Sequence, residues 1–424
     1  MEAFHYRQHR LLAEDVALAD IAERFGTPTW VYSKAAIASA FDEFAGAAAG
    51  RKVLVCYALK ANSNLAIVDL LARRGAGFDI VSGGELERGL TAGGDASRIV
   101  FSGVGKTRAE MQRALEVGVR CFNVESESEL RRLDEVAGAL GRRAPVSLRV
   151  NPDVDAGTHP YISTGLRENK FGIAHEEALR VYRLAASLPN LDVLGIDCHI
   201  GSQITTIEPF LAALDKGLEL VDTLAAAGIA LKHLDLGGGL GIRYDDETPP
   251  SRAALLQAVF ERLDRHPRGR EFEVLFEFGR SIVGNAGVLL TRVEYLKTNA
   301  DRRFAIVDAA MNDLMRPSLY EAWHDVLPVD ASAPREAAAW DVVGPVCESG
   351  DWLARGRRLA IGEGDLLAVL SAGAYGLAVS SNYNTRPRGA EVLVSGDKAV
   401  LVRERERVED LFAHERRLPD ELAG

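Results

Sequence analysis

Between residues 50 and 284 the chain alternates eight times between a short apolar run and an amphipathic stretch of helical character. The eight runs are VLVCYALK (53–60), FDIVS (78–82), IVFSG (99–103), RCFNVES (120–126), VSLRVNP (146–152), VLGIDCHIG (193–201), HLDLGGG (233–239) and EVLFEFG (273–279). Strands that are apolar on both faces and separated by helices indicate a parallel sheet. Eight such units predict a (β/α)8 barrel of the TIM type. A doubly wound open sheet would also alternate, but it accounts less naturally for eight repeats.

After Gly284 the pattern changes to β-rich runs without comparable long helices between them. The residues SGDK at 395–398 join two such runs and predict a β-hairpin. The TPTWVYS segment at 27–33 precedes the first barrel unit and can add a strand to the same sheet. We therefore expect a barrel over 34–284 and a mostly antiparallel β domain over 285–424, with 1–33 contributing a strand.

The net charge of −11 argues against a nucleic-acid or anionic-membrane partner, because both attract basic surfaces. The longest apolar stretch (366–379) is too short and too interrupted by glycine to span a bilayer, and the polar first twenty residues do not resemble a signal peptide. The cysteines lie far apart, without a CxxC pair. We expect a cytoplasmic protein that binds small molecules.

Polar residues and glycines end most of the predicted strands. In a barrel of this type the active site forms at the C-terminal ends of the strands. A single polar residue there is usually just solvated, but many on one face predict a site. The residues in question are Lys60, Asp79, Ser82, Arg149, Asn151, His199, Ser202, Gly237, Gly238, Gly239, Glu277 and Arg280.

The glycines of DLGGGLG (235–241) follow the seventh strand, where successive backbone N–H groups can point at one anion. Loops after strands seven and eight are the usual phosphate site of such barrels. Ser202 can supply a hydroxyl to the same anion. A tight turn would explain the glycines equally well.

A lysine across the barrel from a phosphate site predicts pyridoxal 5'-phosphate, whose aldehyde condenses with an amine. Lys60 is the predicted amine, and Glu277 is the predicted carboxylate that keeps the pyridine nitrogen protonated. A protonated ring accepts an electron pair strongly, which suits loss of CO2. His199 can stack on the ring, although a hydrogen-bonded core histidine is the competing interpretation.

Two other chemistries compete with this interpretation. We expect no metal site, because the region has no HExxH motif and no histidine pair at i, i+4. An aldolase that acts on a phosphorylated substrate through a Schiff-base lysine would use the same barrel, lysine and glycine loop.

Motifs along nearly the whole chain resemble, in the same order, those of bacterial diaminopimelate decarboxylases. They are YALKANSN, GAGFDIVSGGEL, THPYISTGLRENKFGI, CHIGSQ, DLGGGLGI, MRPSLY, GPVCESGDWL and GAYG. That family has fold type III and is similar to alanine racemase and ornithine decarboxylase. The resemblance implies decarboxylation of meso-2,6-diaminopimelate at its D-configured carbon to give L-lysine, the last step of lysine biosynthesis.

The resemblance also implies a role for each matching residue. Lys60, His199 and Cys347 are catalytic, and Cys347 reaches the site of a partner subunit to deliver the proton that replaces CO2. A homodimer with shared active sites follows. The cofactor-binding residues are Lys60, Asp79, Arg149, His199, Ser202, Gly237, Gly238, Gly239, Glu277, Gly279, Arg280 and Tyr375. The substrate-binding residues are Arg280, Arg316 and Tyr320 for carboxylates, Glu348 for the distal amino group, and Tyr375.

One position departs from the family pattern. The family has proline after the Glu277 position, whereas this chain has Phe278. Proline fixes φ and lacks an N–H group, so we expect Phe278 to strain the loop that holds Glu277 and Arg280 and to add bulk near the cofactor. Phe278→Pro would then improve cofactor retention.

Related enzymes provide the alternatives. An alanine racemase would place an arginine against the pyridine nitrogen, so Glu277 favours decarboxylation. An ornithine or arginine decarboxylase would lack a carboxylate clamp such as Arg316. Decarboxylases of carboxynorspermidine, ornithine or a specialised-pathway amino acid stay as the alternative function. A non-enzymatic cofactor-binding barrel would not have the long β domain.

Overall fold

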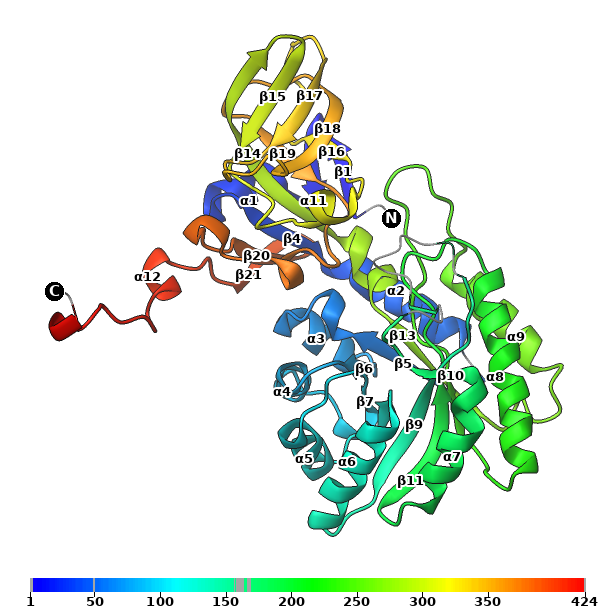
Figure 1. Cartoon of the computed structure of the whole chain (residues 1–424). Helices are drawn as coiled ribbons and strands as arrows, with labels where there is room; N and C mark the ends of the chain where they lie inside the picture. Colours follow the sequence, from blue (N-terminus) through cyan, green and yellow to red (C-terminus); the bar gives the residue numbers. More distant parts are fainter. Residues whose placement is uncertain (1–2, 49, 156, 158–163, 166–168, 423–424) are drawn as a thin grey trace. The chain divides into compact units, whose positions relative to one another are not determined.

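The chain folds into two units of different architecture (Figure 1). One unit consists of Ala36–Asn285, and the other combines Met1–Ala35 with Ala286–Gly424. The second unit is therefore built from both ends of the chain. The computed structural model describes residues 3–48, 50–155, 157, 164–165 and 169–422.

A closed barrel of eight parallel strands forms the core of the Ala36–Asn285 unit. The strands follow one another as β5, β6, β7, β8, β9, β11, β12 and β13, and β13 pairs with β5 to close the ring. This confirms the predicted TIM-type barrel, and each predicted run overlaps one strand in the same order. The bounds are Val53–Ala58, Gly77–Ile80, Ile99–Phe101, Cys121–Val124, Ala144–Asn151, Leu191–Asp197, His233–Asp235 and Glu273–Phe278, with the short β10 (Ile173–Ala174) beside β9.

The strands read as continuous apolar runs because both of their faces are covered. Every residue of β6, β7 and β8 is buried, either inside the barrel or under the helices. The strands end earlier than the predicted runs, with β5 ending at Ala58 and β12 at Asp235. The polar residues and glycines that follow therefore lie in the loops at the barrel mouth.

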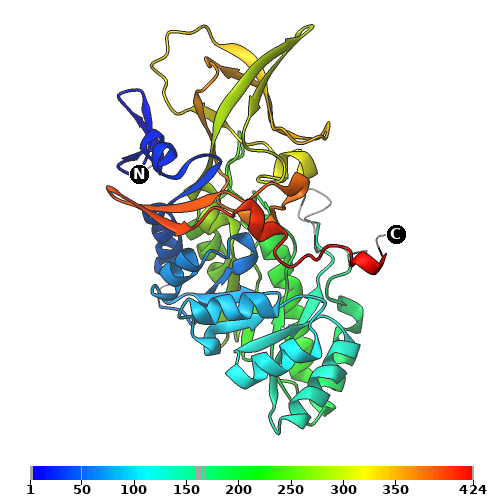
Figure 2. The same ribbon diagram turned by 90° about the vertical axis from the view of Figure 1, so that its left-hand side faces the viewer.

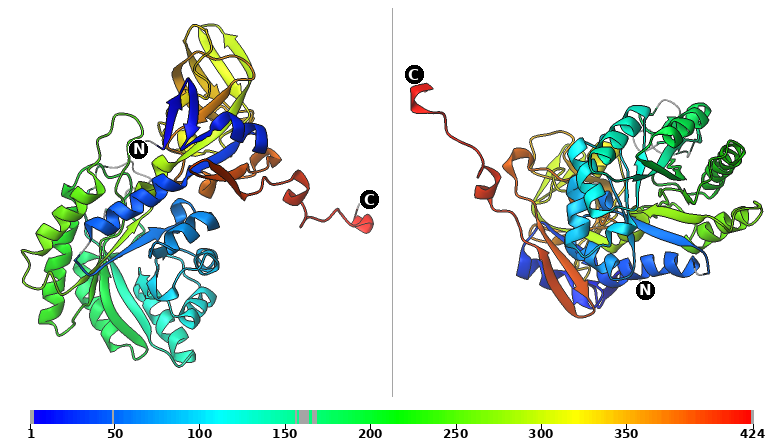
Figure 3. Two further views of the ribbon diagram at one scale, coloured as in Figure 1. Left: turned by 180° about the vertical axis from the view of Figure 1, so that it is seen from behind. Right: turned by 90° about the horizontal axis from the view of Figure 1, so that it is seen from below.

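Helices surround this barrel, with α3 to α6 on one side and α7 to α9 on the other (Figures 1 and 3). Several of these helices start at a side-chain cap. Ser82, predicted at the barrel mouth, caps α4 by accepting a hydrogen bond of 3.2 Å from the backbone N–H of Glu85. The helices are α2 (Lys34–Ala47), α3 (Leu65–Ala72), α4 (Gly83–Thr91), α5 (Arg108–Val117), α6 (Glu127–Ala139), α7 (Ala178–Ser187), α8 (Glu208–Ala226), α9 (Arg252–Leu263) and α10 (Arg280–Val283).

Within the described ranges, the structure contains no helix with the length and apolar character that a membrane span requires.

A mixed sheet forms the other unit. Its longest strand, β14 (Gly287–Asn299), pairs with β4 (Thr29–Ser33), β15 (Arg302–Val307) and β19 (Leu366–Val369) (Figures 1 and 2). Among the described pairings, β15–β17 and β4–β20 are parallel and the others are antiparallel, in agreement with the predicted mostly antiparallel domain. The remaining strands are β16 (Val326–Pro328), β17 (Ala338–Val343), β18 (Trp352–Leu359), β20 (Ala390–Ser395) and β21 (Lys398–Arg403).

The predicted hairpin is present between β20 and β21, where Gly396 adopts a positive φ of 60° that costs glycine little. β4 lies between β14 and β20 in the same sheet. The N-terminal strands β1 (Phe4–Arg7), β2 (Arg10–Ala13) and β3 (Val16–Ala17) form a separate small sheet. The helices of this unit are α1 (Leu18–Phe25), α11 (Arg316–Tyr320) and α12 (Val408–Leu411).

β13 directs Glu277 and Phe278 to opposite faces, as the two-residue period of a strand requires. Glu277 contacts side chains that follow β7 and lie on β8 inside the barrel. Phe278 instead stacks on Phe44 of α2, with ring centroids 3.9 Å apart, and is only 1% exposed. The expectation that Phe278 adds bulk beside Glu277 is therefore wrong, because the ring fills the space between the barrel and α2.

Replacing Phe278 by alanine is expected to lower the free energy of unfolding by about 3–5 kcal/mol, because it leaves a cavity against Phe44. Chemical denaturation measures the change. Phe412→Ala is the control: Phe412 is 49% exposed, so its loss should cost about 0.5 kcal/mol or less. Phe278→Pro also removes the stacked ring and should destabilise the fold. A gain in stability or in cofactor retention from Phe278→Pro would restore the strain hypothesis.

Candidate active site

Lys60 lies in a single helical turn directly after β5, at the mouth of the barrel. Its Nζ is 2.6 Å from Oδ2 of Asp79, which is fully buried at β6, while the Lys60 side chain is about one-third exposed. Burial and the negative charge of Glu277 raise the pKa of Asp79 to about 7, although Lys60 partly offsets them. Asp79 can therefore exchange a proton near neutral pH while it is paired with Lys60.

Glu277, on β13, points into the barrel and takes part in a hydrogen-bond network. Its Oε1 accepts hydrogen bonds of 3.2 Å from both Ser102 Oγ and Asn123 Nδ2. Its Oε2 lies 3.6 Å from Nδ1 of His199. Burial opposes ionisation, but the contact with His199 and the positive charges of Lys60 and Arg149 outweigh it and lower the pKa of Glu277 to about 2. Glu277 is therefore an ionised carboxylate inside the barrel.

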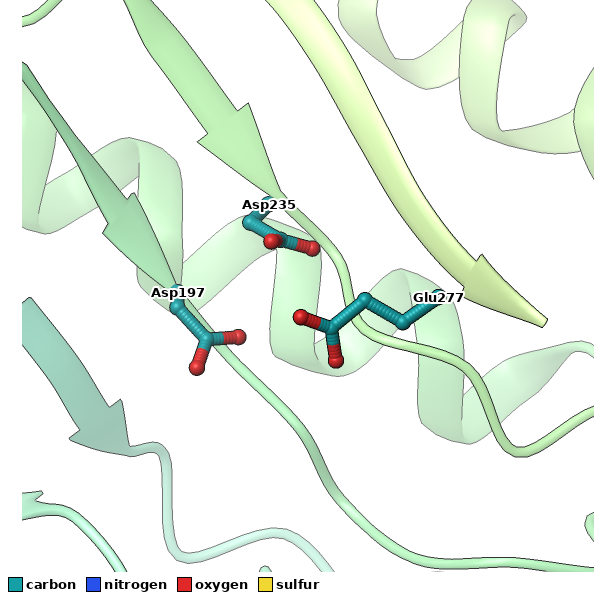
Figure 4. Close-up of side chains that lie close together, drawn as sticks. All are labelled: Asp197, Asp235 and Glu277. Atoms are coloured by element: carbon teal, nitrogen blue, oxygen red, sulfur yellow. The ribbon is translucent and has the colours of Figure 1, made fainter. Parts of the chain in front are cut away.

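Asp197 at the end of β11 and Asp235 at the end of β12 point toward Glu277, which lies on β13 (Figure 4). Each of the three carboxyl groups has an oxygen within 4.8 Å of the others. Burial, followed by the charge of Glu277, raises the pKa values of Asp197 and Asp235 well above their ordinary range. Ionisation is thus disfavoured at Asp197 and Asp235 and favoured at Glu277.

This cluster is also the group among the described residues whose geometry suits a metal ion. Metal ligands must be deprotonated, whereas burial and the charge of Glu277 oppose the ionised forms of Asp197 and Asp235. Asp235 also accepts hydrogen bonds from Gly237 N at 3.0 Å and Asn123 Nδ2 at 3.3 Å. Asn123 Nδ2 donates to Glu277 as well, so we interpret Asp235 and Asn123 as a support that helps to hold Glu277. The expectation that the chain needs no metal stays a prediction.

The glycine loop after β12 fits tightly against its neighbours. Gly237 and Gly239 have positive φ angles of 62° and 102°. A Cβ atom at Gly238 would lie 2.0 Å from the carbonyl oxygen of Glu277. Paired backbone hydrogen bonds of 2.9 Å, from Ile204 N to Gly239 O and from Gly241 N to Ile204 O, join this loop to the HIGSQ loop after β11. Only glycine allows this close approach of the two loops, while the binding of an anion by this loop stays a prediction.

A buried arginine stands beside the same HIGSQ loop. Arg280, at the start of α10, donates to Ser202 Oγ at 3.1 Å and to the hydroxyl of Tyr244 at 2.6 Å. A Cβ atom at Gly279 would lie 2.8 Å from that of Ala61, so Gly279 lets the end of β13 pack against the turn that carries Lys60. A hydroxyl from the loop after the sixth barrel strand, a glycine backbone after the seventh and a guanidinium after the eighth thus come together, and donors of these kinds suit a phosphate group.

Arg149 at β9 is held by an ion pair rather than exposed at the mouth. Its Nη1 lies 3.0 Å from Glu125 Oε1, and its guanidinium stands over the ring of Phe171. Glu125 is held in turn by the backbone N–H of Gly172 at 2.9 Å. Asn151 accepts a hydrogen bond from the backbone N–H of Asp153, which stabilises the turn after β9. Residues 158–163 and 166–168 of the THPYISTGLRENKFGI motif lie outside the described residues.

Five predicted site residues belong to the β unit. Arg316, at the start of α11, is buried and lies with its Nη1 2.7 Å from Nε2 of His324. Glu348 accepts a hydrogen bond of 2.5 Å from the hydroxyl of Tyr383. The other three are Cys347, which is exposed, Tyr320 at the end of α11, and Tyr375, which has a positive φ of 53°.

Sequence reasoning missed the residues that hold the predicted ones in place. Five of them lie on barrel strands or directly after them, where inward alternation near the strand ends was the available signal, whereas Tyr244 lies in the loop between β12 and α9 and His324 lies just before β16. The missed residues are Ser102, Asn123, Glu125, Asp197, Asp235, Tyr244 and His324.

Comparison with known proteins identifies the chemistry of this barrel. Residues 34–284 match a family described as pyridoxal-dependent decarboxylases, pyridoxal binding domain. A diaminopimelate decarboxylase of Pseudomonas fluorescens is 65% identical to this chain over 423 residues, which cover 99% of the chain and 100% of that protein. The chain belongs to the diaminopimelate decarboxylase family. The diaminopimelate decarboxylase of Vibrio cholerae is 58% identical over the same share of both proteins.

Solved structures of the diaminopimelate decarboxylase family have the same fold. The enzyme of M. jannaschii in complex with L-lysine has a TM-score of 0.94 and 38% identity, covering 99% of each chain. The enzyme of Helicobacter pylori in complex with L-lysine has a TM-score of 0.89 and 43% identity, covering 94% of this chain and 99% of that one. The predicted family, the decarboxylase activity and the pyridoxal phosphate cofactor are thereby confirmed.

The described residues fit this cofactor. Pyridoxal phosphate needs an amine for its aldehyde, donors for its phosphate and an acid–base partner for its pyridine nitrogen. Lys60 provides the amine beside Asp79. Arg280 and Ser202 provide donors next to the glycine loop. Glu277 provides an ionised carboxylate. The donor set of the barrel thus contains each group that the cofactor requires.

Proposed function

We propose that this diaminopimelate decarboxylase releases CO2 from the D-configured carbon of meso-2,6-diaminopimelate, giving L-lysine, with the residues assigned below. The observation that carries the assignment is the ionised Glu277 together with the Lys60–Asp79 pair in one barrel. Bound pyridoxal phosphate supplies an electron sink for the pair of electrons that CO2 leaves behind. The residues of the chain must hold the cofactor, orient the substrate and move protons.

The barrel residues hold the cofactor. Lys60 Nζ would be the amine that holds the cofactor aldehyde, with Asp79 Oδ2, 2.6 Å away, as the neighbouring proton acceptor. The phosphate is proposed to bind to Arg280, Ser202 and the backbone of Gly237–Gly239. The contacts that bring these groups together support this assignment. The Glu277 carboxylate would hold the protonated pyridine nitrogen, and His199 would stack on the cofactor ring. Arg149 and Asp79 complete the surroundings.

Residues of the β unit select the substrate. The Arg316 guanidinium binds the distal carboxylate in a bidentate manner, with Tyr320 beside it. Glu348, which already accepts a hydrogen bond from Tyr383, binds the distal ammonium group. Tyr375 contacts both cofactor and substrate. Cys347 Sγ donates the proton that replaces CO2, and its exposed thiol is consistent with that role.

We further propose a cytoplasmic homodimer in which each active site combines Lys60 of one protomer with Cys347 of its partner. A two-fold dimer makes both sites equivalent. The net charge of −11 supports small amino-acid substrates over nucleic acid or anionic membranes as partners.

Substrate choice tests the proposed function. We expect CO2 release, measured in parallel at equal concentrations, to be fastest with meso-diaminopimelate and far slower with D-lysine, ornithine and arginine. D-lysine has the same D-configured reacting centre but no distal carboxylate, so it isolates the contribution of the clamp. Faster release from ornithine would instead support the alternative function, a related decarboxylase of another amino acid.

Arg316→Ala tests the clamp itself. Removing a charge-assisted interaction of roughly 1.5–3 kcal/mol should lower kcat/KM for meso-diaminopimelate by about 10- to 150-fold. The value for D-lysine should change much less, because that substrate has no distal carboxylate. Arg316→Lys keeps the charge but not the planar fork, and we expect an intermediate loss. Equal losses on both substrates would show that Arg316 does not bind the distal carboxylate.

A further inference from the structure

We propose that His324 is a positioning residue that fixes the guanidinium of Arg316 for binding the distal carboxylate. This inference rests on the proposed role of Arg316. His324 lies just before β16, its side chain is completely buried, and both of its ring nitrogens face partners of the same unit. Its Nε2 is 2.7 Å from Arg316 Nη1, and its Nδ1 is 2.7 Å from the carbonyl oxygen of Leu370.

The chemistry of the two partners fixes the state of the imidazole. A guanidinium only donates hydrogen bonds, and a carbonyl oxygen only accepts them. Nδ1 must therefore carry the hydrogen that is donated to Leu370, and Nε2 must accept from Arg316. His324 is thus a neutral acceptor that is aimed at one nitrogen of Arg316, in a tautomer set by the backbone.

The backbone on both sides of the imidazole is anchored in the sheet. Leu370 directly follows β19, which pairs with β16 in the register Val326 to Val369. The carbonyl oxygen of His324 accepts a hydrogen bond of 2.9 Å from Arg357 Nη2 of β18. The Arg357 guanidinium also stands over the ring of Trp323. The backbone that carries the imidazole is therefore fixed in position, and the imidazole can hold Arg316 in place.

Arg316 needs such an anchor because its own helix is short. α11 comprises only the five residues Arg316–Tyr320 and ends at Glu321, which has a positive φ of 52°. A helix of this length is not stable on its own, so tertiary contacts must set the position of its side chains. A bidentate contact to a carboxylate also requires a fixed guanidinium plane. The hydrogen bond to His324 fixes that plane at Nη1.

Two substitutions separate the two hydrogen bonds of the imidazole. In His324→Asn, the amide can replace Nδ1 as donor to Leu370 but is too short to reach Arg316. In His324→Gln, the longer side chain places an acceptor near the position of Nε2. We expect His324→Asn to raise KM for meso-diaminopimelate by about 10- to 100-fold, as a displacement of about 1 Å does, with little change in kcat. We expect His324→Gln to recover most of this loss.

The selectivity of the effect distinguishes positioning from general damage. D-lysine lacks the distal carboxylate, so its KM should be unchanged in His324→Asn. L-lysine retains that carboxylate, so its dissociation constant, measured by calorimetry with the cofactor-loaded protein, should rise by the same factor as KM for meso-diaminopimelate. Arg357→Met is the matched control, because it removes a contact to the backbone of His324 without removing the acceptor for Arg316. Because the pairing of β16 with β19 still holds the backbone, we expect Arg357→Met to lower stability and to change selectivity far less than His324→Asn does.

Each result either supports or overturns the inference. Unchanged selectivity in His324→Asn, with the expected loss in Arg316→Ala, would overturn the role of His324 and leave the role of Arg316 standing. An equal loss on meso-diaminopimelate and D-lysine in Arg316→Ala would instead overturn the proposed clamp. A selectivity change in Arg357→Met as large as that in His324→Asn would assign the effect to local order and overturn the specific role of the imidazole.

Discussion

Lys60→Ala is expected to lower kcat/KM by at least about 10³-fold, because it removes the proposed covalent attachment point of the cofactor and the amine beside Asp79. The purified wild-type protein should absorb as a bound pyridoxal chromophore, whereas the variant should not retain the cofactor covalently. Borohydride reduction of the wild-type protein followed by peptide mapping should place the pyridoxyl group on the peptide that contains Lys60.

The chain supplies an internal comparison for this labelling experiment. Lys106 is a second lysine of the barrel, but its side chain is only 1% exposed and its ammonium binds Glu129 and the carbonyl oxygens of Gly103 and Asn123. We therefore expect no label at Lys106. A pyridoxyl group at Lys106 or at another lysine would contradict the assignment of Lys60, and so would a Lys60→Ala variant that keeps the covalent chromophore.

The second large effect concerns the proposed sharing of sites between protomers. Lys60→Ala and Cys347→Ala should each be nearly inactive alone, because every site in either homodimer lacks one of the two residues. When the two variants are refolded together in equal amounts, about half of the dimers are mixed. Each mixed dimer contains one site with both residues intact. Random reassortment therefore predicts roughly a quarter of the wild-type activity.

The control for this experiment is a mixture of two variants that both replace the same residue. Lys60→Ala refolded with Lys60→Met should recover nothing, because every site lacks the lysine. Different affinity tags on the two chains establish that mixed dimers are present. If mixed dimers of Lys60→Ala and Cys347→Ala form and stay inactive, the two residues do not meet across a dimer interface. The shared site would then be wrong, although Lys60 could keep its own role.

The barrel was predictable because its signal is local. β6, β7 and β8 are buried on both faces, so each is a short apolar run that the sequence displays directly. The position of Lys60 and of the glycine loop followed from the ends of such runs. The same rule failed for Ser82, where the spacing to Glu85 was the signature of a helix cap.

The supporting residues were not predictable in the same way, because their contacts join distant parts of the chain. Asn123 reaches Glu277 across 154 positions, and the partners of Arg316 and His324 depend on how β16 pairs with β19. The spacing of apolar residues along the sequence does not show which residues of two distant strands pair with each other. Phe278 was within reach, since alternation along β13 already places it opposite to Glu277. The proline of the family suggested an effect on the loop after β13, whereas the structure shows Phe278 stacked on Phe44.

The place of β4 in the sheet affects how the chain can fold as it is synthesised. All five residues of Thr29–Ser33 are buried, and their sheet partners are β14 and β20. β14 begins at Gly287, so this apolar strand leaves the ribosome more than 250 residues before its first partner. At about 5–20 residues per second, that interval lasts roughly 10–50 s. The barrel strands are made during this interval, and β13, which closes the barrel, ends only nine residues before β14 begins. β4 therefore stays without its sheet partners for nearly the whole synthesis of the barrel, as an apolar strand with unpaired backbone groups that is exposed to aggregation.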